Sequence, residues 1–268
     1  MILKARRFEI DIFCFFYNHE KYVADCLESI LAQKTSAKIK IIAHDDCSTD
    51  GTLGILKEYS KKYSFIELIE QKKNKYSQIG AGAIKFLVEK STAEYIALMD
   101  GDDYWVDENK IEEQLKLLLS NRNCKVCSTN TIIETKSVDD KNKKKAKLSK
   151  KDIYLDGGAI STSSIVLRRE VLDDRLLKIL NKSPVGDYFI QAYAYQLGDC
   201  ILNYNEFATV YRLNEGSVSK RETIFTKNSL YTLYALSKFL TMKGNGNRIL
   251  IMLRIFKFLI NRTKQAFN

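Results

Sequence analysis

The chain has 268 residues, of which 45% are hydrophobic and 28% are charged. This composition can bury a large core, and it excludes a predominantly disordered chain. The formal net charge is +10, but the excess is concentrated in two segments. Residues 136–151 hold eight Lys and two Asp, and residues 223–268 hold eight Lys or Arg and no acid. The remainder is mildly acidic, so we expect no nucleic acid as a partner.

The six cysteines include one CxxC pair, Cys124 and Cys127. Because no second pair and no nearby histidine complete a zinc site, the cysteines are typical of small core residues in a reducing compartment. No stretch reaches about 18 uncharged apolar residues, and residues 1–7 lack the apolar part of a secretory signal. We therefore expect a cytoplasmic protein that does not span a membrane.

Strand and helix patterns alternate in the first part of the chain. Strands are predicted at residues 8–16, 38–43, 65–70 and 94–99, and helices at residues 22–31, 53–62 and 81–90. The strand at 94–99 has no polar alternation, which is typical of a strand buried on both faces. Such alternation predicts an α/β fold with a mostly parallel sheet and helices on both faces, whose ligands bind beyond the carboxyl ends of the strands.

The second part of the chain is less regular. A helix is predicted from near Asp107 to residue 119, strands at 125–134, 160–167, 199–205 and 207–213, and helices at 168–180 and 187–198. Residues 136–151 are expected to form a mobile loop. Residues 221–268 are expected to form a basic helical tail, in which residues 248–265 either contact a membrane surface or pack on the body of the protein or on another subunit.

Polar clusters follow three of the predicted parallel strands, and we expect them to converge at one edge of the sheet. They are Tyr17-Asn18, Asp45-Asp46 and the acids Asp100, Asp102 and Asp103. Each cluster on its own could be a cap or a turn. The last three acids would repel one another unless a cation compensated them, and Mg²⁺ or Mn²⁺ suits such oxygen ligands together with phosphates. No glycine-rich dinucleotide fingerprint and no P-loop sequence occurs, which argues against dehydrogenases and P-loop nucleotidases.

Four motifs, in this order, resemble the family 2 glycosyltransferases of the GT-A fold. They are residues 16–20 (FYNHE), 29–33 (SILAQ), 45–52 (DDCSTDGT) and 99–105 (MDGDDYW). The resemblance is close over about the first 110 residues and looser to residue 219. It implies a Rossmann-like catalytic domain at 1–220, with a nucleotide-binding half to about residue 105 and an acceptor half after it, followed by C-terminal helices.

The resemblance also implies the reaction. One sugar would move, with inversion, from a nucleotide-diphosphate sugar to a saccharide or lipid-linked saccharide, in the synthesis of a bacterial surface polysaccharide. A UDP-sugar is the expected donor, and Mn²⁺ or Mg²⁺ the expected cofactor. The enzyme would lie in the cytoplasm, with possible peripheral contact with the inner face of the membrane.

On the donor side, the resemblance places Tyr17 and Asn18 beside the nucleotide. Asp45 or Asp46 would bond the base, and Asp100 would bond the ribose or the metal.

The resemblance implies three further roles around the reaction itself. Asp102 is the expected principal metal ligand, with Asp103 as a neighbouring candidate. Asn214, where the family often has His, could offer an amide oxygen to the metal. Asp187 corresponds to the general base, although an acid before a helix is also the usual N-cap.

Two other functions stay open. A nucleotidyltransferase would be expected to carry a glycine-rich, lysine-containing loop after the first strand, where this chain has residues 17–20 (YNHE). A noncatalytic protein could bind RNA or acidic lipid through the basic loop and tail, and its binding would survive the loss of Asp102 and Asp187.

Overall fold

The structure is a computed structural model, and it describes residues 8–134, 147–148, 153–154, 160–198 and 201–213, with residues 236, 239, 249, 251, 252 and 255. The expectation of a loop at 136–151 lies outside these residues except at positions 147–148. The expectations for Asn214 and for most of the tail at 221–268 also lie outside the described residues.

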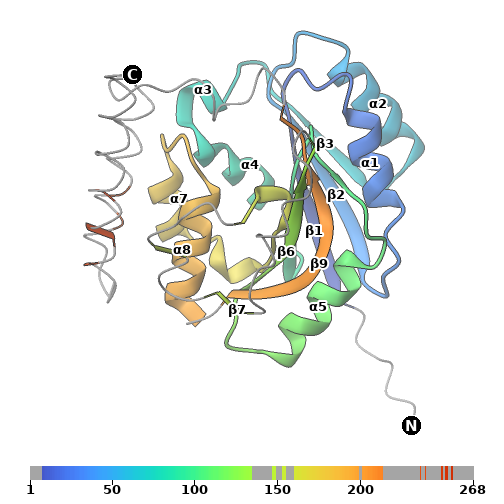
Figure 1. Cartoon of the computed structure of the whole chain (residues 1–268). Coiled ribbons are helices and arrows are strands. Elements are labelled where there is room, and N and C mark those ends of the chain that lie inside the picture. The colour runs from blue at the N-terminus through green and yellow to red at the C-terminus, as the bar shows by residue number, and fades with distance from the viewer. Residues whose placement is uncertain are drawn as a thin grey trace.

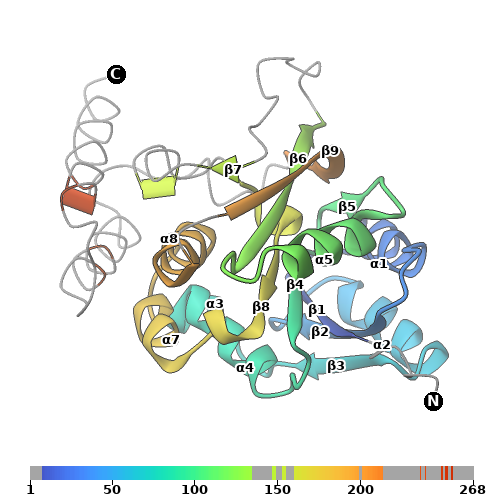
Figure 2. The same cartoon turned by 90° about the horizontal axis from the view of Figure 1, so that it is seen from below.

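A mixed sheet forms the centre of the molecule (Figures 1 and 2). Within the described residues, its strands are β1 (Glu9–Phe16), β2 (Lys38–Asp45), β3 (Ile66–Glu70), β4 (Tyr95–Asp100), β5 (Tyr104–Trp105), β6 (Val126–Ile133), β7 (Lys147–Leu148), β8 (Val166–Arg168) and β9 (Ile201–Tyr211). Their order is β3-β2-β1-β4-β8-β6-β9-β5, and β7 pairs with β9. The strands β3, β2, β1 and β4 are parallel, whereas β8 runs antiparallel to both β4 and β6.

Helices cover both faces of this sheet, which confirms the predicted α/β fold. The α-helices are α1 (Val23–Leu31), α2 (Thr52–Lys62), α3 (Tyr76–Ile79), α4 (Lys85–Val88), α5 (Lys110–Ser120), α7 (Asp174–Leu180) and α8 (Asp187–Gly198). Short 3-10 turns are η1 (Ala81–Ile84), η3 (Thr162–Ser164) and η4 (Arg169–Val171). The helices α1, α2 and α5 lie on one face, and α4, α7 and α8 lie on the other (Figure 1).

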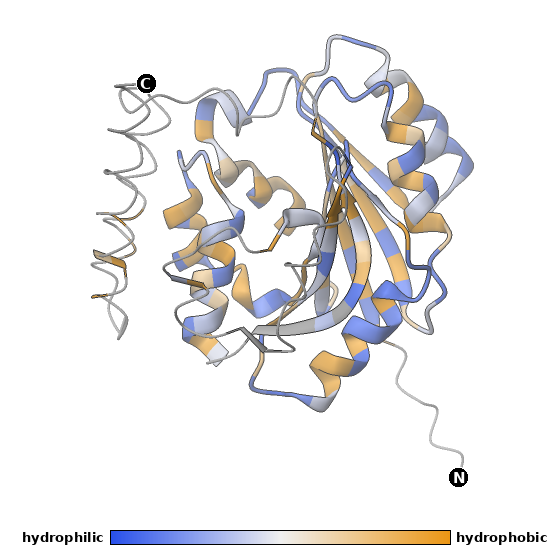
Figure 3. Cartoon of the chain, in the orientation of Figure 1, coloured by the Kyte–Doolittle hydropathy of each residue, from blue (hydrophilic) through white to orange (hydrophobic). Residues whose placement is uncertain are grey.

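The central strands are buried on both faces because their side chains alternate between two hydrophobic clusters. In β1, Ile12 packs under α1 and α5, whereas Phe13 packs toward α4 and α8. In β4, Ala97 and Leu98 divide in the same way. Figure 3 shows apolar residues concentrated on these strands and on the helix sides that cover them. The prediction that 94–99 forms a doubly buried strand is confirmed.

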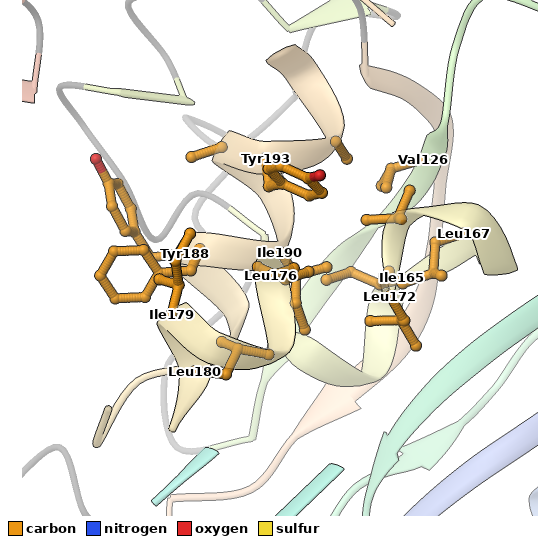
Figure 4. Packing of buried hydrophobic residues seen from close by; sticks show 14 of the residues in the cluster. Val126, Ile165, Leu167, Leu172, Leu176, Ile179, Leu180, Tyr188, Ile190 and Tyr193 are labelled. Atoms are coloured by element: carbon orange, nitrogen blue, oxygen red, sulfur yellow. The ribbon is translucent and has the colours of Figure 1, made fainter. Parts of the chain in front are cut away.

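The cluster under α7 and α8 also receives part of the tail. Figure 4 shows residues of both helices packing against the sheet. The ring of Phe239 lies 6.4 Å from the ring of Tyr154 and 6.0 Å from that of Phe189, centre to centre. Leu236 and Ile251 are buried in the same cluster. At these positions the tail packs on the body of the protein, which is one of the three arrangements that the sequence leaves open.

Three predicted elements have other bounds in the structure. The strand predicted at 160–167 is reduced to β8, because residues 162–164 form η3. In place of two strands, the described residues 201–213 hold the single long strand β9, whose register against β6 shifts beside Asn130. The helix expected from residue 168 begins only at Asp174, because 166–168 pair as β8. Asp173 then caps α7 by accepting hydrogen bonds from the backbone N–H groups of Arg175 and Leu176.

The cysteines also differ in part from the expectation. Cys14, Cys26, Cys47 and Cys127 are free thiols. Cys124 is disulfide-bonded, so the expectation of reduced core cysteines is wrong at this position. The disulfide bond of Cys124 is therefore not formed with Cys127, the other member of the CxxC pair.

Candidate active site

The strands β1, β2 and β4 end side by side. The strand register pairs Phe16 with Asp45 and Phe15 with Asp100. Because these strands are parallel, the polar residues that follow them lie at one edge of the sheet. The structure thus brings the three predicted clusters to a common edge, with Asp45 and Asp100 separated by only the end of β1.

The loops after β1 and β2 hold each other in place. Asn18 has a positive φ of 56°, and its Oδ1 accepts a hydrogen bond from Thr49 N at 2.8 Å. The backbone N–H of Asn18 donates to Ser48 Oγ at 3.0 Å. Glu20 and Gly51 add a similar bond between the loops, from Gly51 N to Glu20 Oε2 at 3.0 Å. The Asn18 side chain therefore braces the loops, whereas Tyr17 beside it is 45% exposed.

Asp45 and Asp46 have different surroundings. Both carboxylate oxygens of Asp46 accept backbone hydrogen bonds, from Lys75 N at 2.5 Å and from Tyr76 N at 2.8 Å. Asp45 is completely buried, and its Oδ2 accepts from Ser48 N at 3.1 Å, but its Oδ1 has no partner. An unsatisfied buried acceptor costs roughly 1–3 kcal/mol. Of the two acids, Asp45 is therefore the one with an oxygen left for a ligand.

The turn after β4 carries three acids with unequal exposure. Asp103 is fully buried; its Oδ2 accepts from Ser163 Oγ at 2.6 Å, and its Oδ1 accepts from Arg212 N at 3.1 Å. Burial, and to a smaller extent the charge of Asp102, raises the pKa of Asp103 to about 7 despite the opposing hydrogen bond from Ser163. The Asp102 side chain stays 17% exposed. Asp102, and Asp100, which is also partly exposed, are therefore the acids of this turn that can meet a ligand from solvent.

Gly101 is required in this turn by packing. A Cβ at this position would lie 2.2 Å from the Phe16 ring and 2.8 Å from His19 Nδ1. His19 Nε2 lies 4.0 Å from Asp102 Oδ2. Burial lowers the pKa of His19, an effect that the charges of Asp102 and Asp50 oppose. The lowered pKa favours a neutral His19 ring, which adds no positive charge beside Asp102.

Asp187 belongs to the same electrostatic group as the acids after β4. It is the first residue of α8, and its Oδ1 accepts a hydrogen bond from Tyr188 N at 2.7 Å. Burial and the charges of Asp103 and Asp102 raise the pKa of Asp100 well above its usual range, and Asp187 adds to this rise. The structure therefore brings the predicted base within electrostatic reach of the predicted metal ligands.

Sequence reasoning missed two residues that shape the acidic turn. Ser163, in η3, accepts from Asp100 N at 3.0 Å while it donates to Asp103. Arg212, just after β9, donates through its guanidinium to Asp25 Oδ2 at 2.7 Å. Its guanidinium also lies 4.3 Å from the centre of the Tyr104 ring. Because both residues reach the turn from segments at least 60 positions away, no local pattern predicts these contacts.

The motif at residues 29–33 has a structural role. Ser29 Oγ accepts from Trp105 N at 3.1 Å. The Gln33 amide donates to Asp107 O at 2.8 Å and accepts from Ile111 N at 3.1 Å. The motif thus ties α1 to the segment that follows the acidic turn.

The model of glycosyl transferase family 2 matches residues 11–176 of this chain. The chain belongs to that family. An uncharacterized protein of Mycobacterium tuberculosis is 32% identical over 206 residues, which are 73% of this chain and 56% of that protein. The E. coli UDP-Glc:alpha-D-GlcNAc-diphosphoundecaprenol beta-1,3-glucosyltransferase WfgD is 27% identical over 77% of this chain and 78% of its own length. The chain thus spans just over half the length of its mycobacterial relative.

Solved structures share the fold of this family 2 chain. S. aureus TarS in complex with UDP-GlcNAc has a TM-score of 0.73, at 18% identity, over 96% of this chain and 73% of that one. The mannosyltransferase PcManGT of Pyrobaculum calidifontis, in complex with GDP-Man and Mn²⁺, has a TM-score of 0.68 at 14% identity, over 97% of this chain and 74% of that one. These likenesses confirm the predicted GT-A fold.

A buried lysine packs against the segment that follows the acidic turn of this family 2 chain. Lys110 Nζ donates to Gln114 Oε1 at 2.7 Å and lies 4.2 Å from the centre of the Trp105 ring. The Trp105 Nε1–H donates to Ser163 O at 2.7 Å. Because Lys110 is completely buried, its pKa falls to about 7. The amine is therefore a group whose charge changes near neutral pH.

Replacing Lys110 with Met should remove a pH-dependent part of the stability. Above a pH of about 7, the folded chain releases this proton, while the unfolded chain keeps it up to about pH 10.5. Because the unfolded state then binds more protons, the free energy of unfolding should rise with pH in this window. Urea unfolding between about pH 7 and pH 8.5 should show this rise in the wild type relative to Lys110→Met. Parallel pH dependence of the two proteins would contradict a lowered pKa.

Proposed function

We propose that this chain is an inverting glycosyltransferase that moves one sugar from a UDP-sugar to a saccharide or lipid-linked saccharide acceptor. The observation that carries this proposal is the arrangement along one sheet edge. A buried carboxylate with an unpartnered oxygen, Asp45, lies at one end, and the acids Asp100, Asp102 and Asp187 lie at the other. WfgD, by its name a UDP-glucose-dependent transferase acting on a diphosphoundecaprenol-linked sugar, supports the same donor and acceptor classes.

Recognition of the nucleobase is assigned to Asp45. Its Oδ1 is an acceptor in need of a donor, and the uracil ring presents one N–H between two carbonyl groups. Cytosine has no hydrogen at the corresponding nitrogen, and its nearest donor is the neighbouring exocyclic amine, so its ring would have to shift to reach Asp45. The exposed Tyr17 ring, at the end of β1, could cover the nucleoside. Asp46 would not bind the nucleobase itself, because its oxygens already hold the backbone N–H groups of residues 75–76.

A divalent cation, Mn²⁺ or Mg²⁺, fits the acids after β4. Asp102 would be the main ligand because it is partly exposed, and Asp100 a second one, since burial and the charges of Asp103 and Asp102 raise its pKa and a cation would offset these charges. Both oxygens of Asp103 already accept hydrogen bonds. In the described part of the chain, no group of three or more acidic, His or Cys side chains could hold a metal alone. The remaining ligands would come from the donor diphosphate, or from Asn214. Once bound, the cation would stabilise the charge of the leaving diphosphate.

Asp187 is proposed as the general base. Inversion requires a carboxylate on the acceptor side that takes the proton of the attacking hydroxyl as the new bond forms. Asp187 lies on α8, in the half of the chain that follows the acidic turn, and is close enough to affect Asp100. Its first oxygen accepts the Tyr188 N–H. This bond fixes the orientation of the carboxylate toward the helix.

Calorimetric titration with UDP and with CDP, each with Mn²⁺ and with a chelator, tests the donor assignment. UDP should bind in the presence of Mn²⁺, and CDP should bind about 10- to 100-fold more weakly because the ring nitrogen of cytosine carries no hydrogen for Asp45. Asp45→Asn should reduce this discrimination. Equal affinity for UDP and CDP, or UDP binding that ignores Mn²⁺, would contradict the proposal. RNA binding that persists without Asp102 and Asp187, together with no UDP binding by the wild type, would favour the noncatalytic alternative.

The location of the acceptor is a further part of the proposal. No helix in the described ranges is long and apolar enough to cross a membrane. Ile249 and Met252 are 75% and 58% exposed, although Ile251 between them in sequence is buried. We propose peripheral contact of residues 248–265 with the inner face of the membrane, through these apolar side chains and the basic residues of the segment. Equal sedimentation of wild type and the Ile249→Ser, Met252→Ser double variant with anionic vesicles would argue against it.

A further inference from the structure

The turn that precedes Asp187 is attached to a segment about one hundred residues earlier. Gly80 and Ser183 form a backbone bridge, in which Ala81 N donates to Ser183 O at 2.6 Å. Lys182 N donates to Ile79 O at 2.7 Å. Gly80 has a φ of 56°, and a Cβ there would lie 2.1 Å from Ser183 O. This position therefore needs glycine, and the two backbones are in direct contact.

A side chain makes a second attachment closer to Asp187. The hydroxyl of Tyr76 donates to the carbonyl oxygen of Pro184 at 2.6 Å. Pro184 has a fixed φ, so a restraint on its carbonyl group limits the path of the chain toward α8. Next along the turn, a Cβ on Gly186 would lie 3.1 Å from Ala81 Cβ. The turn is thus held at successive positions up to the residue before Asp187.

The other end of this segment is anchored at the donor edge. Asp46, only 5% exposed, accepts hydrogen bonds from the backbone N–H groups of Lys75 and Tyr76. Asp46 N itself donates to Phe16 O at the end of β1, at 2.9 Å. The connection therefore runs from the sheet edge through Asp46 and Tyr76 to Pro184. Each step is a hydrogen bond between groups that the fold holds in place.

From these contacts we propose that Tyr76 is a positioning residue for Asp187: its hydroxyl fixes the Pro184 carbonyl, and this sets where the carboxylate stands relative to the acids after β4. The inference rests on the proposed function, since it assumes that Asp187 takes a proton. Misplacement of a reacting group by about 1 Å can cost about 100-fold in rate. Loss of one restraint among several should cost less.

Tyr76→Phe is the appropriate variant because it removes only the hydroxyl and keeps the ring. The substrate is whichever nucleotide sugar gives the fastest nucleotide release in a panel of UDP-, dTDP- and GDP-sugars with Mn²⁺. We expect kcat to fall about tenfold, while KM for the donor and the affinity for UDP stay unchanged. The thermal midpoint should move by no more than about 4 °C, as for one partly exposed hydrogen bond.

A double-mutant cycle separates positioning from general destabilisation. In the Asp187→Asn background, Tyr76→Phe should have no further effect on the residual rate, because there is no base left to position. The same fold-reduction in both backgrounds would overturn the inference. Tyr59→Phe is the matched control, since the Tyr59 hydroxyl donates to Glu28 Oε1 at 2.7 Å between α1 and α2. Its kcat should equal that of the wild type.

The outcomes also distinguish this inference from the proposed function. If Asp187→Asn loses activity while Tyr76→Phe retains the wild-type kcat, the inference fails and the function stands. If the wild type releases nucleotide from no sugar of the panel, or if Asp187→Asn keeps full activity, the proposed function or its base is lost and the inference falls with it.

Discussion

Replacing Asp187 with Asn is expected to lower the rate of sugar transfer by about 10²- to 10⁴-fold and to leave UDP binding unchanged. The amide keeps the shape of the side chain and can still accept the Tyr188 N–H, but it cannot take a proton from the acceptor hydroxyl. Removing one negative charge near Asp100 should also lower the pKa of Asp100, because Asp187 contributes to raising it. Donor binding with Mn²⁺ should therefore not weaken.

The measurement combines nucleotide release from the donor with calorimetric titration of UDP. Asp174→Asn is a suitable control, because Asp174 is also the first residue of a helix in this half of the chain, α7, and is exposed. It should leave both quantities at wild-type values. A wild-type rate in Asp187→Asn would remove this residue from the mechanism.

Replacing Asp102 with Ala is expected to abolish the enhancement of UDP binding by Mn²⁺. Loss of groups that only orient a metal ligand costs about 10- to 100-fold in metal affinity, so loss of the main ligand should cost at least about 100-fold. Without Mn²⁺ the variant should bind UDP no worse than the wild type, since one repulsive charge near the diphosphate is gone. Asp102→Ala should thus weaken UDP binding when Mn²⁺ is present and should not weaken it when Mn²⁺ is absent.

Titrations of wild type and variant with UDP, each with Mn²⁺ and with a chelator, give the four affinities needed. Glu108→Ala provides the control, because Glu108 follows the acidic turn closely but pairs with Lys34 on the surface. It should retain the full Mn²⁺ effect. An undiminished Mn²⁺ effect in Asp102→Ala would assign the metal to other ligands.

The regular half of the fold could be predicted because its strands are short, apolar and separated by amphipathic helices. The pattern is strongest in β1 and β4, where both faces are covered. It fails where pairing depends on distant residues. The strand predicted at 160–167 is present only at its end, as β8, where Val166 and Leu167 find partners in β4 and β6, while residues 162–164 form the turn η3. Likewise β9 stays continuous because β6 accommodates a register shift beside Asn130.

In the candidate site too, local features could be predicted from the sequence, whereas contacts between distant residues could not. Strand ends could be located from the sequence, so the acids at one sheet edge were predicted as a group. The sequence could not separate Asp45 from Asp46, because both follow the same strand and differ only in partners from residues 48 and 75–76. Ser163 and Tyr76 were missed for a related reason: each acts on a residue at least 60 positions away.

The bridge between Gly80 and Ser183 bears on how members of this family can be recombined. A chimera that joins the first half of this chain to the second half of a relative would separate two segments whose backbones meet without room for a Cβ. Residues 76–82 would therefore have to be exchanged together with residues 180–187, although they lie in the nucleotide-binding half of the sequence. Chimeras designed on sequence boundaries alone should fold, but their Asp187 should be misplaced relative to the acids after β4. Chimeras that take both segments from the same parent protein should keep that parent's placement of Asp187.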